Sequence, residues 1–279
     1  LALVPKKAGE DFIAAARRKY ELVHSYDHPT VGVSPSLNAF DLAALLKDAP
    51  ASVDVVSHSR RGLVTRWWFE GFADPRTNLR GMFVGSPIAG TSFAAPARLR
   101  AALNFLTNVG GVLQQAADIA SATPMFAAAS VLMRVLNSIT RVAANTPLID
   151  AAVAMIPGLD AQSRSGTNGE ILRLRQNTGN AGLEYFAVKS NFMPQGHGWA
   201  FWRYFVRPKQ YLVNWTADLV FDGDNDLVVD TASMIELADQ TTIDKKRTLD
   251  FGTTADVHHT NYFRQAETVK FIRESFKIG

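Results

Sequence analysis

Apolar residues in the first third of the chain recur in two alternating periods. Segments with a helical period and segments with strand character take turns, in the order helix 10–20, strand 20–26, helix 36–47, strand 53–56, helix 62–69 and strand 81–87. In the second helix, the predicted apolar stripe consists of Phe40, Leu42, Leu45 and Leu46. Regular alternation of helix and strand is typical of a parallel, doubly wound sheet with right-handed crossovers. We therefore predict an α/β fold.

This alternation stops at about residue 93. From there to residue 168 the chain is rich in Ala and Leu and is interrupted by glycine and proline. Two interpretations are open: additional core helices, or a helical cap whose apolar composition would suit an acyl chain. We predict one domain over residues 1–279, with residues 93–168 as an inserted cap. The remaining chain has turn formers at 163–180, strand character at 183–189 and 217–221, and an amphipathic helix at 266–276.

Composition narrows the chemistry further. The 279 residues include no cysteine, which excludes disulfides, thiolate metal sites and a cysteine nucleophile. The formal charge of +3 comes from scattered Lys and Arg without a basic stripe, so we expect no nucleic-acid partner. The longest apolar-leaning run, residues 119–133, contains Pro124 and is too short to cross a bilayer. We expect a soluble protein that can touch a lipid interface; the composition does not determine compartment or oligomeric state.

A candidate nucleophile lies where the strand 53–56 meets the following helix. Residues 57–62 read Ser-His-Ser-Arg-Arg-Gly, so a serine, Ser59, stands at the apex of a sharp strand-to-helix turn. This is the shape of the nucleophile elbow, G-x-S-x-G, which lifts a hydroxyl above the carboxyl ends of the strands. Ser57 and Arg61 occupy its two glycine positions, and Gly62 follows one residue later. The alternative interpretation is an ordinary strand-to-helix turn.

A serine nucleophile needs a histidine base, and the base works best when a carboxylate orients it. The chain order Ser, then acid, then His is that of the α/β-hydrolases. The acid candidates lie in one loop after a late strand: Asp222, Asp224, Asp226 and Asp230. We prefer Asp226, because a short apolar run follows it directly. For the base we prefer His259 to its neighbour His258, which spacing does not exclude.

Each of these residues also has a structural interpretation. The alternate aspartates resemble the start of a calcium loop, but Leu227 and Ser233 replace its Gly and Glu, so a turn capped by Asp and Asn is the better alternative. The paired histidines lack further zinc ligands, and we predict no metal. His58 is interpreted as a packing or supporting residue, because adjacent residues point apart. Three other histidines have no partner pattern and are assigned to surface or structure: His24, His28 and His197.

Four motifs together carry a family resemblance. Residues 57–66 read SHSRRGLVTR against the pattern [T/S/G]-H-S-R-G-G-L-V-x-R, and residues 85–91 read GSPIAGT against G-[ST]-P-x-x-G-[ST]. Residues 225–228 (NDLV) and 259–262 (HTNY) complete the set. From about Tyr26 to the C-terminus, the chain resembles the bacterial lipase and esterase branch of the α/β-hydrolase superfamily.

This resemblance implies an α/β-hydrolase-type, mostly parallel sheet with an inserted helical cap. It also implies ester hydrolysis by Ser59, Asp226 and His259, with the backbone N–H of Arg60 as one oxyanion donor and no cofactor or metal. The substrate would be a small-molecule or lipid ester. The acyl chain would lie against the apolar cap and the aromatic residues of a loop at 196–205: Trp199, Phe201 and Trp202.

Two departures from the family pattern leave alternatives open. Arg61 stands at a position where the family has glycine, which could crowd the site. No His-Gly motif, whose loop supplies the second oxyanion donor in the family, precedes the first predicted helix. Since the chain begins with Leu1, we expect this first strand and any targeting segment to lie upstream of it. The alternatives are a catalytically silent domain that binds a lipid or protein partner through its cap, and an acyltransferase with the same triad.

Overall fold

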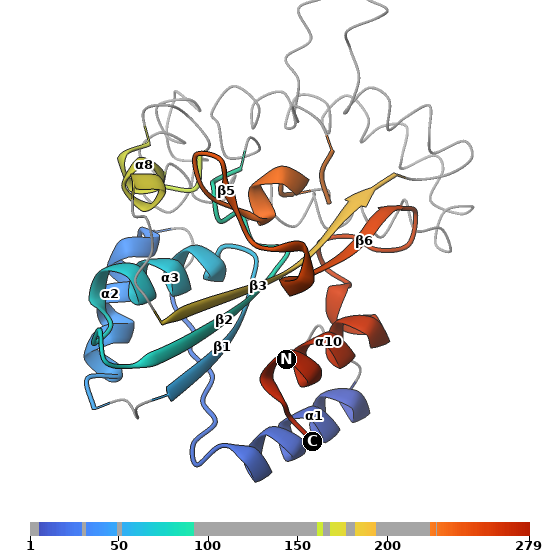
Figure 1. Cartoon of the computed structure of the whole chain (residues 1–279), viewed down its shortest axis with the longest axis horizontal. Helices are drawn as coiled ribbons and strands as arrows, with labels where there is room; N and C mark the ends of the chain where they lie inside the picture. Colours follow the sequence, from blue (N-terminus) through green and yellow to red (C-terminus); the bar gives the residue numbers. More distant parts are fainter. Residues whose placement is uncertain are drawn as a thin grey trace, which may run out of the picture.

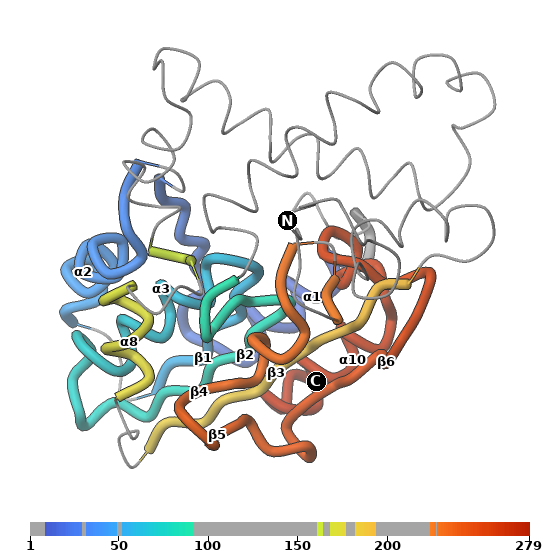
Figure 2. Tube along the Cα trace, turned by 90° about the horizontal axis from the view of Figure 1, so that it is seen from above, coloured from blue at the N-terminus to red at the C-terminus, as the bar shows by residue number. Residues whose placement is uncertain are grey.

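The structure is a computed structural model and describes residues 6–29, 32–48, 52–91, 161–163, 168–176, 182–193, 224–226 and 228–279. These residues form a mixed α/β fold around a four-stranded sheet. Its strands are β1 (Ser52–His58), β2 (Asn78–Val84), β3 (Leu183–Phe192) and β6 (Thr248–Thr254). All neighbouring pairs are parallel, in the order β1-β2-β3-β6 (Figures 1 and 2). The predicted α/β class with a parallel sheet is therefore observed.

One face of the sheet is covered by α2 (Pro35–Leu45), α3 (Arg61–Trp67) and the π-helix η1 (Trp68–Phe72) that continues α3. Successive side chains of a strand point to opposite faces. On β2, Leu79 and Phe83 point to this face and are fully buried against the helices. Helix α3, which directly follows β1, packs on this face through Val64.

The opposite face is covered by α1 (Lys6–Lys19) and α10 (Ala266–Phe276), which lie next to each other in Figure 1. Met82 and Val84 of β2 point to this side and contact a cluster that includes Phe276 of α10. Helices on both faces explain why the central strands are buried on both sides. The predictions of helices at 10–20 and 266–276 are confirmed, the first with an earlier start.

The strand predicted for residues 20–26 is wrong. Residues 20–29 form no regular hydrogen-bonded structure and are held instead by side-chain contacts. The Tyr26 hydroxyl donates to the carbonyl of Asn38 over 2.9 Å, and the Tyr20 hydroxyl bonds the carboxylate of Asp54 on β1. Within the described part of the chain, β1 has only β2 as a strand partner. The order before the sheet is consequently helix-helix-strand.

The apolar stripe predicted for the second helix is half wrong. Phe40 and Leu45 are 57% and 70% exposed, whereas Ala39 is fully buried among the side chains of α3 and η1. The helix begins at Pro35, whose preceding residue Ser34 accepts a capping hydrogen bond from the N–H of Leu37. A small residue at position 39 lets α2 approach α3 closely. With Ala39 on the buried side of α2, Phe40 and Leu45 face the solvent.

The second half of the chain holds elements that the pattern did not predict. Helix α8 (Gly169–Gln176) occupies part of the segment where we expected turns, and β6 was not predicted as a strand. The shorter elements are the antiparallel pair β4 (Glu236–Ala238) and β5 (Thr241–Thr242) and the 3₁₀ turns η3 (Thr231–Met234), η4 (Lys245–Arg247) and η5 (Tyr262–Arg264). The predicted strand at 217–221 lies outside the described residues. So does the predicted cap at 93–168, apart from residues 161–163 and 168.

In the ranges that the structure describes, none of the helices combines the length and the apolar character that a membrane span requires.

Candidate active site

Ser59 stands at the tight turn between β1 and α3. Its φ of 58° lies in the left-handed region, which side chains other than glycine seldom adopt. Two backbone hydrogen bonds hold this conformation: the Ser59 N–H donates to the carbonyl of Val84, and the Ser59 carbonyl accepts from the N–H of Gly62, both over 3.0 Å. A strained backbone that its surroundings enforce is common at functional sites. The turn leaves the Ser59 side chain half-buried at the carboxyl end of β1.

The close contact expected at the elbow is made by Gly62 rather than at position 61. A Cβ on Gly62 would lie 2.4 Å from the Cβ of Ser86, just past the end of β2, so only glycine fits there. The Arg61 side chain is 46% exposed and pairs with Asp27 over 3.1 Å. Arginine at position 61 is therefore compatible with the turn.

His259 lies in the loop between β6 and α10 and is nearly buried. Its Nε2 is 2.8 Å from the Oγ of Ser59, and its Nδ1 is 3.0 Å from Oδ2 of Asp226. Asn261 braces this loop, because its Oδ1 accepts from the N–H of His258 and its Nδ2 donates to the carbonyl of Asp256 over 2.6 Å. The histidine is thereby held between the serine and the carboxylate.

Asp226 is completely buried near the end of β3. The preceding residue, Asn225, donates its backbone N–H to Oδ1 of Asn191 on that strand, which fixes the start of the loop. Oδ1 of Asp226 accepts the N–H groups of Val228 and Val229 over 3.2 and 2.9 Å. Because an ionised carboxylate only accepts hydrogen bonds, the His259 nitrogen that faces it carries the proton. The other ring nitrogen then presents a lone pair to Ser59.

The alternative histidine and aspartates make other contacts than His259 and Asp226. Of the two adjacent histidines, His258 points elsewhere: its Nδ1 lies 3.2 Å from the Thr260 hydroxyl, and its ring packs edge-on against Phe192. Burial lowers the pKa of His258 to about 4. Of the aspartates, Asp226 contacts His259, whereas Asp224 contributes its carbonyl to the loop and Asp222 is not among the described residues.

His58 supports the loop that carries His259. Its Nε2 is 2.7 Å from the His259 carbonyl, and the two rings are 4.8 Å apart. Burial, together with the neighbouring His259, lowers the pKa of His58 to about 3, so the ring is neutral near pH 7. A neutral ring that faces a carbonyl must present its N–H there, and His58 therefore donates this bond.

Arg60 follows the serine directly. Its backbone N–H donates to none of the described residues, which leaves a donor beside the Ser59 hydroxyl. Its side chain is buried, with Nη2 bonded to the carbonyl of Val33 and Nη1 3.4 Å from Nδ1 of His28. Burial lowers the pKa of the Arg60 guanidinium to about 10. The side chain therefore anchors the turn while the backbone N–H stays available.

Two predicted parts of the site lie outside the described residues: the cap and the aromatic residues Trp199, Phe201 and Trp202. Conversely, no role was predicted for Tyr262, whose hydroxyl donates to Oδ2 of Asp226 over 2.9 Å. The only signal for it was its place in the motif HTNY, three residues after His259.

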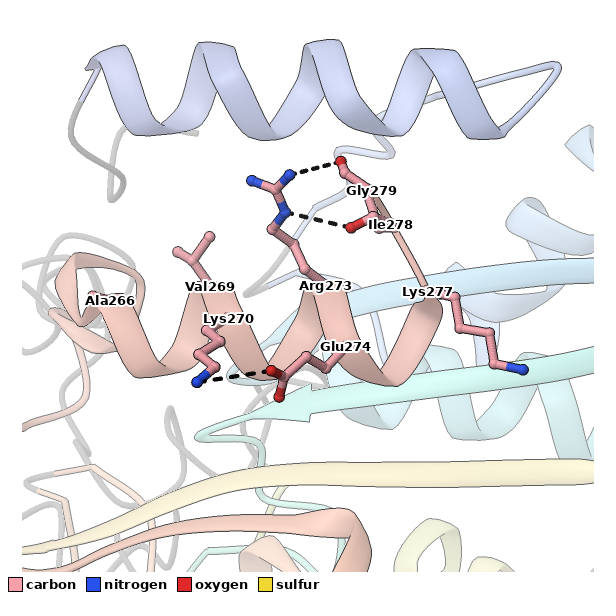
Figure 3. A pocket seen from close by; sticks show the side chains of 8 residues that line it. All are labelled: Ala266, Val269, Lys270, Arg273, Glu274, Lys277, Ile278 and Gly279. Carbon is pink, nitrogen blue, oxygen red and sulfur yellow. Dashed lines mark hydrogen bonds and ion pairs between the residues drawn. The ribbon is translucent and has the colours of Figure 1, made fainter.

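A surface groove of about 710 Å³ runs along α10 and is lined by residues of this helix and of the chain end that follows it (Figure 3). Three of its four charged side chains have local partners: Arg273 bonds the carbonyls of Ile278 and Gly279, and Lys270 pairs with Glu274. None of the groove residues belongs to the Ser59 cluster, so the groove adds nothing to the candidate site. Within the described ranges, no three His, Asp or Glu side chains converge to hold a metal ion.

A family model described as a domain of unknown function, DUF7379, matches residues 3–277. The chain belongs to the DUF7379 family. A search of curated proteins found no match. In this DUF7379 domain, Ser59, Asp226 and His259 all lie inside the matched span. The cluster is therefore part of the family domain itself and not of an extension to it.

Proposed function

We propose that the chain is a serine ester hydrolase of the lipase and carboxylesterase type with an α/β-hydrolase-type fold. One observation carries the proposal: a continuous hydrogen-bond chain from Asp226 through His259 to Ser59, whose backbone is held in a strained turn. Ser59 follows β1, His259 lies in the loop after β6, and Asp226 lies beside the end of β3. In open α/β sheets, ligands bind at the carboxyl ends of the strands.

In the first step, Oγ of Ser59 attacks the ester carbonyl carbon while Nε2 of His259 takes the hydroxyl proton. The carbonyl oxygen becomes an oxyanion, which the backbone N–H of Arg60 stabilises. Collapse of this intermediate breaks the bond to the alcohol oxygen, and His259 returns the proton to the leaving alcohol. Asp226 stabilises the protonated imidazole and keeps its tautomer. The product of this step is an acyl ester on Ser59.

In the second step, a water molecule attacks the acyl-enzyme. His259 takes its proton, and collapse of the second intermediate releases the carboxylic acid and returns the proton to Ser59. The arrangement requires no cofactor. The acyl chain would lie against the predicted cap and the aromatic residues Trp199, Phe201 and Trp202.

Intact-mass measurement after treatment with a fluorophosphonate tests this proposal. The wild-type chain should gain the mass of one adduct, because this reagent reacts with an activated serine. Ser59→Ala should gain none and should also lose turnover of a short p-nitrophenyl ester by several orders of magnitude. Thermal stability should change little, since the Ser59 side chain is only half-buried.

Ser57→Ala is the matched control. Ser57 lies two residues away and is buried, and its hydroxyl bonds the carbonyl of Met82, not a histidine. This variant should still take one adduct. A folded wild-type chain that takes no adduct would overturn the proposal and would favour a catalytically silent domain.

A further inference from the structure

A buried phenol lies behind the carboxylate of Asp226. The hydroxyl of Tyr262, a residue with no exposed surface, is 2.9 Å from Oδ2 of Asp226 and 2.8 Å from Oγ of Ser190. The same Oδ2 is 3.0 Å from Nδ1 of His259. The hydrogen-bond chain that reaches Ser59 therefore continues inward past the acid.

The direction of the phenol's bond follows from chemistry. Burial, and after it the charge of Asp226, raises the pKa of Tyr262 well above its usual value, so the hydroxyl keeps its single proton. The Asp226 carboxylate only accepts, and the serine hydroxyl of Ser190 can donate to the phenol oxygen. Tyr262 consequently donates to Asp226.

This bond divides the charge of one oxygen between two donors. Oδ1 of Asp226 is occupied by two backbone N–H groups, whereas Oδ2 serves Tyr262 and His259 together. A hydrogen bond to a charged group stabilises it and reduces what the charge offers to its other partner. The phenol therefore competes with the protonated form of His259 for the same oxygen.

The fold makes room for this contact at one position. Gly85, directly after β2, has a φ of +51°, and a Cβ there would lie 2.5 Å from Cε2 of Tyr262 and 3.0 Å from Oδ2 of Asp226. Only glycine allows both groups to meet beside the strand end.

We propose that Tyr262 is a positioning residue that holds Oδ2 of Asp226 against His259 and limits how strongly this carboxylate stabilises the protonated imidazole. The inference rests on the proposed hydrolase function for its kinetic consequence, but the hydrogen bonds themselves do not depend on it. Its effect is to keep His259 unprotonated, and so able to accept the Ser59 proton, to a lower pH.

The other titratable and charged groups around the pair belong to three elements and remain in place when only the phenol hydroxyl is removed. They are His58 at the end of β1, Arg61 at the start of α3, and His258 and Arg264 in the segment before α10. His58, His258 and Arg61 hydrogen-bond to groups other than Asp226, namely the carbonyl of His259, the hydroxyl of Thr260 and the carboxylate of Asp27, so they do not replace the bond from the phenol.

Tyr262→Phe tests the proposal, with Tyr185→Phe as the matched control. Tyr185 is also buried, and its hydroxyl donates to a buried carboxylate, Glu70, over 2.9 Å, but this cluster contains no histidine. In Tyr262→Phe the acidic limb of the pH profile of kcat/KM should move up by about one pH unit, so that turnover on that limb falls about tenfold and recovers at higher pH. Tyr185→Phe should leave the limb in place.

The second readout is independent of turnover. The downfield ¹H NMR signal of the proton between His259 and Asp226 should move further downfield in Tyr262→Phe, because Oδ2 becomes a stronger acceptor. If Tyr262→Phe does not fold, Ser190→Ala, which removes a donor to the phenol, should move both readouts in the same direction by less.

The outcomes separate this inference from the proposed function. An unchanged proton signal, or a loss of turnover that is equal at all pH values, would overturn the role of Tyr262. If the wild-type chain neither hydrolyses esters nor takes a fluorophosphonate, but the proton signal still moves, the proposed function fails and the role of Tyr262 in orienting Asp226 stands.

Discussion

Two buried clusters of this molecule each contain a tyrosine that donates to a carboxylate, and they differ in the basic residue that faces this carboxylate. In one, Tyr185 donates to Glu70, and Glu70 pairs with Arg66 of α3. In the other, Tyr262 donates to Asp226, and Asp226 faces His259. Both carboxylates are almost fully buried, and a tyrosine hydroxyl satisfies one oxygen of each.

The arginine cluster is closed. Arg66 is 1% exposed, and its guanidinium donates to Glu70 and to three backbone carbonyls, those of Ile88, Leu174 and Leu237. These carbonyls belong to the segment after β2, to α8 and to β4, so one side chain ties three separate parts of the chain to α3. An arginine stays protonated in proteins. This cluster can hold the fold together, but it offers no proton that could be exchanged.

The histidine cluster is open at one end. Its last member is an imidazole, a group that can both accept and donate a proton, and the second nitrogen of His259 faces the hydroxyl of Ser59, which is only half-buried. Burial and hydrogen-bonded carboxylates are common to both clusters and do not distinguish them. What differs is whether the last group can exchange a proton and can be reached from outside.

Neutralising the carboxylate of each cluster should have opposite consequences, and this is the largest expected effect. Asp226→Asn should lower turnover by about 10⁴-fold, because an amide that donates to His259 imposes the wrong tautomer. Its cost to stability should be smaller than that of Glu70→Gln, because His259 can remain neutral whereas Arg66 stays charged. Glu70→Gln should leave the labelling of the folded protein by fluorophosphonate unchanged but lower the free energy of unfolding by about 3–5 kcal/mol, since Arg66 would remain buried without its counter-charge.

Steady-state kinetics and urea unfolding of both variants check this pair. The contrast is refuted if Glu70→Gln abolishes labelling of protein that is still folded, or if Asp226→Asn retains wild-type turnover.

Acid should lower the free energy of unfolding through the buried histidines around the histidine cluster, whereas the arginine cluster contains no such histidine among its named members. His58, with a folded pKa of about 3 against an ordinary 6.5, is neutral in the folded state. Between these two values the unfolded chain binds a proton that the folded chain does not, so stability decreases as the pH falls through this window. For one proton the slope is at most about 1.4 kcal/mol per pH unit. His258, with a pKa of about 4, acts in the same direction.

His58→Gln should therefore lose less stability than the wild type between about pH 7 and about pH 4.5. The glutamine amide can still donate to the carbonyl of His259, so the loop should stay in place near neutral pH. Thermal unfolding at both pH values provides the measurement. An identical loss of Tm in the two proteins would show that the ring of His58 is already protonated or exposed in the folded state.

Much of the α/β framework could be predicted from periodicity. Residues 81–84 are an apolar run that is buried in a central parallel strand, and the β-branched run at 53–56 forms the neighbouring strand although it is only half-buried to exposed. The missed strand β6 reads TLDFGTT, with Asp250 and Gly252 in it, and most of it is half-buried or exposed. An edge strand of this kind lacks the apolar alternation on which such predictions depend. Helix α8 was missed because turn formers surround its short sequence.

In the candidate site, too, some residues could be predicted from local sequence patterns and others could not. Ser59, Asp226 and His259 could be named from chain order and local motifs, since each stands in a short segment of recognisable pattern. The choice between His258 and His259 depended on side-chain direction, which neighbouring positions in a loop do not reveal. The hydroxyl of Tyr262 meets a carboxylate 36 residues earlier in the chain, a contact that only the folded arrangement creates.

The smallest expected effect concerns Arg61, which occupies the second glycine position of the pattern G-x-S-x-G. Its side chain is 46% exposed and its partner Asp27 is 92% exposed, and such surface pairs contribute little to stability. Arg61→Gly should therefore leave both Tm and the rate of fluorophosphonate labelling unchanged. Gly62→Ala is the matched control: its new Cβ would lie 2.4 Å from that of Ser86, so α3 must shift, and both quantities should fall. If Arg61→Gly instead accelerates labelling strongly, arginine crowds the serine, and the tight contact at Gly62 does not by itself determine the geometry of the turn.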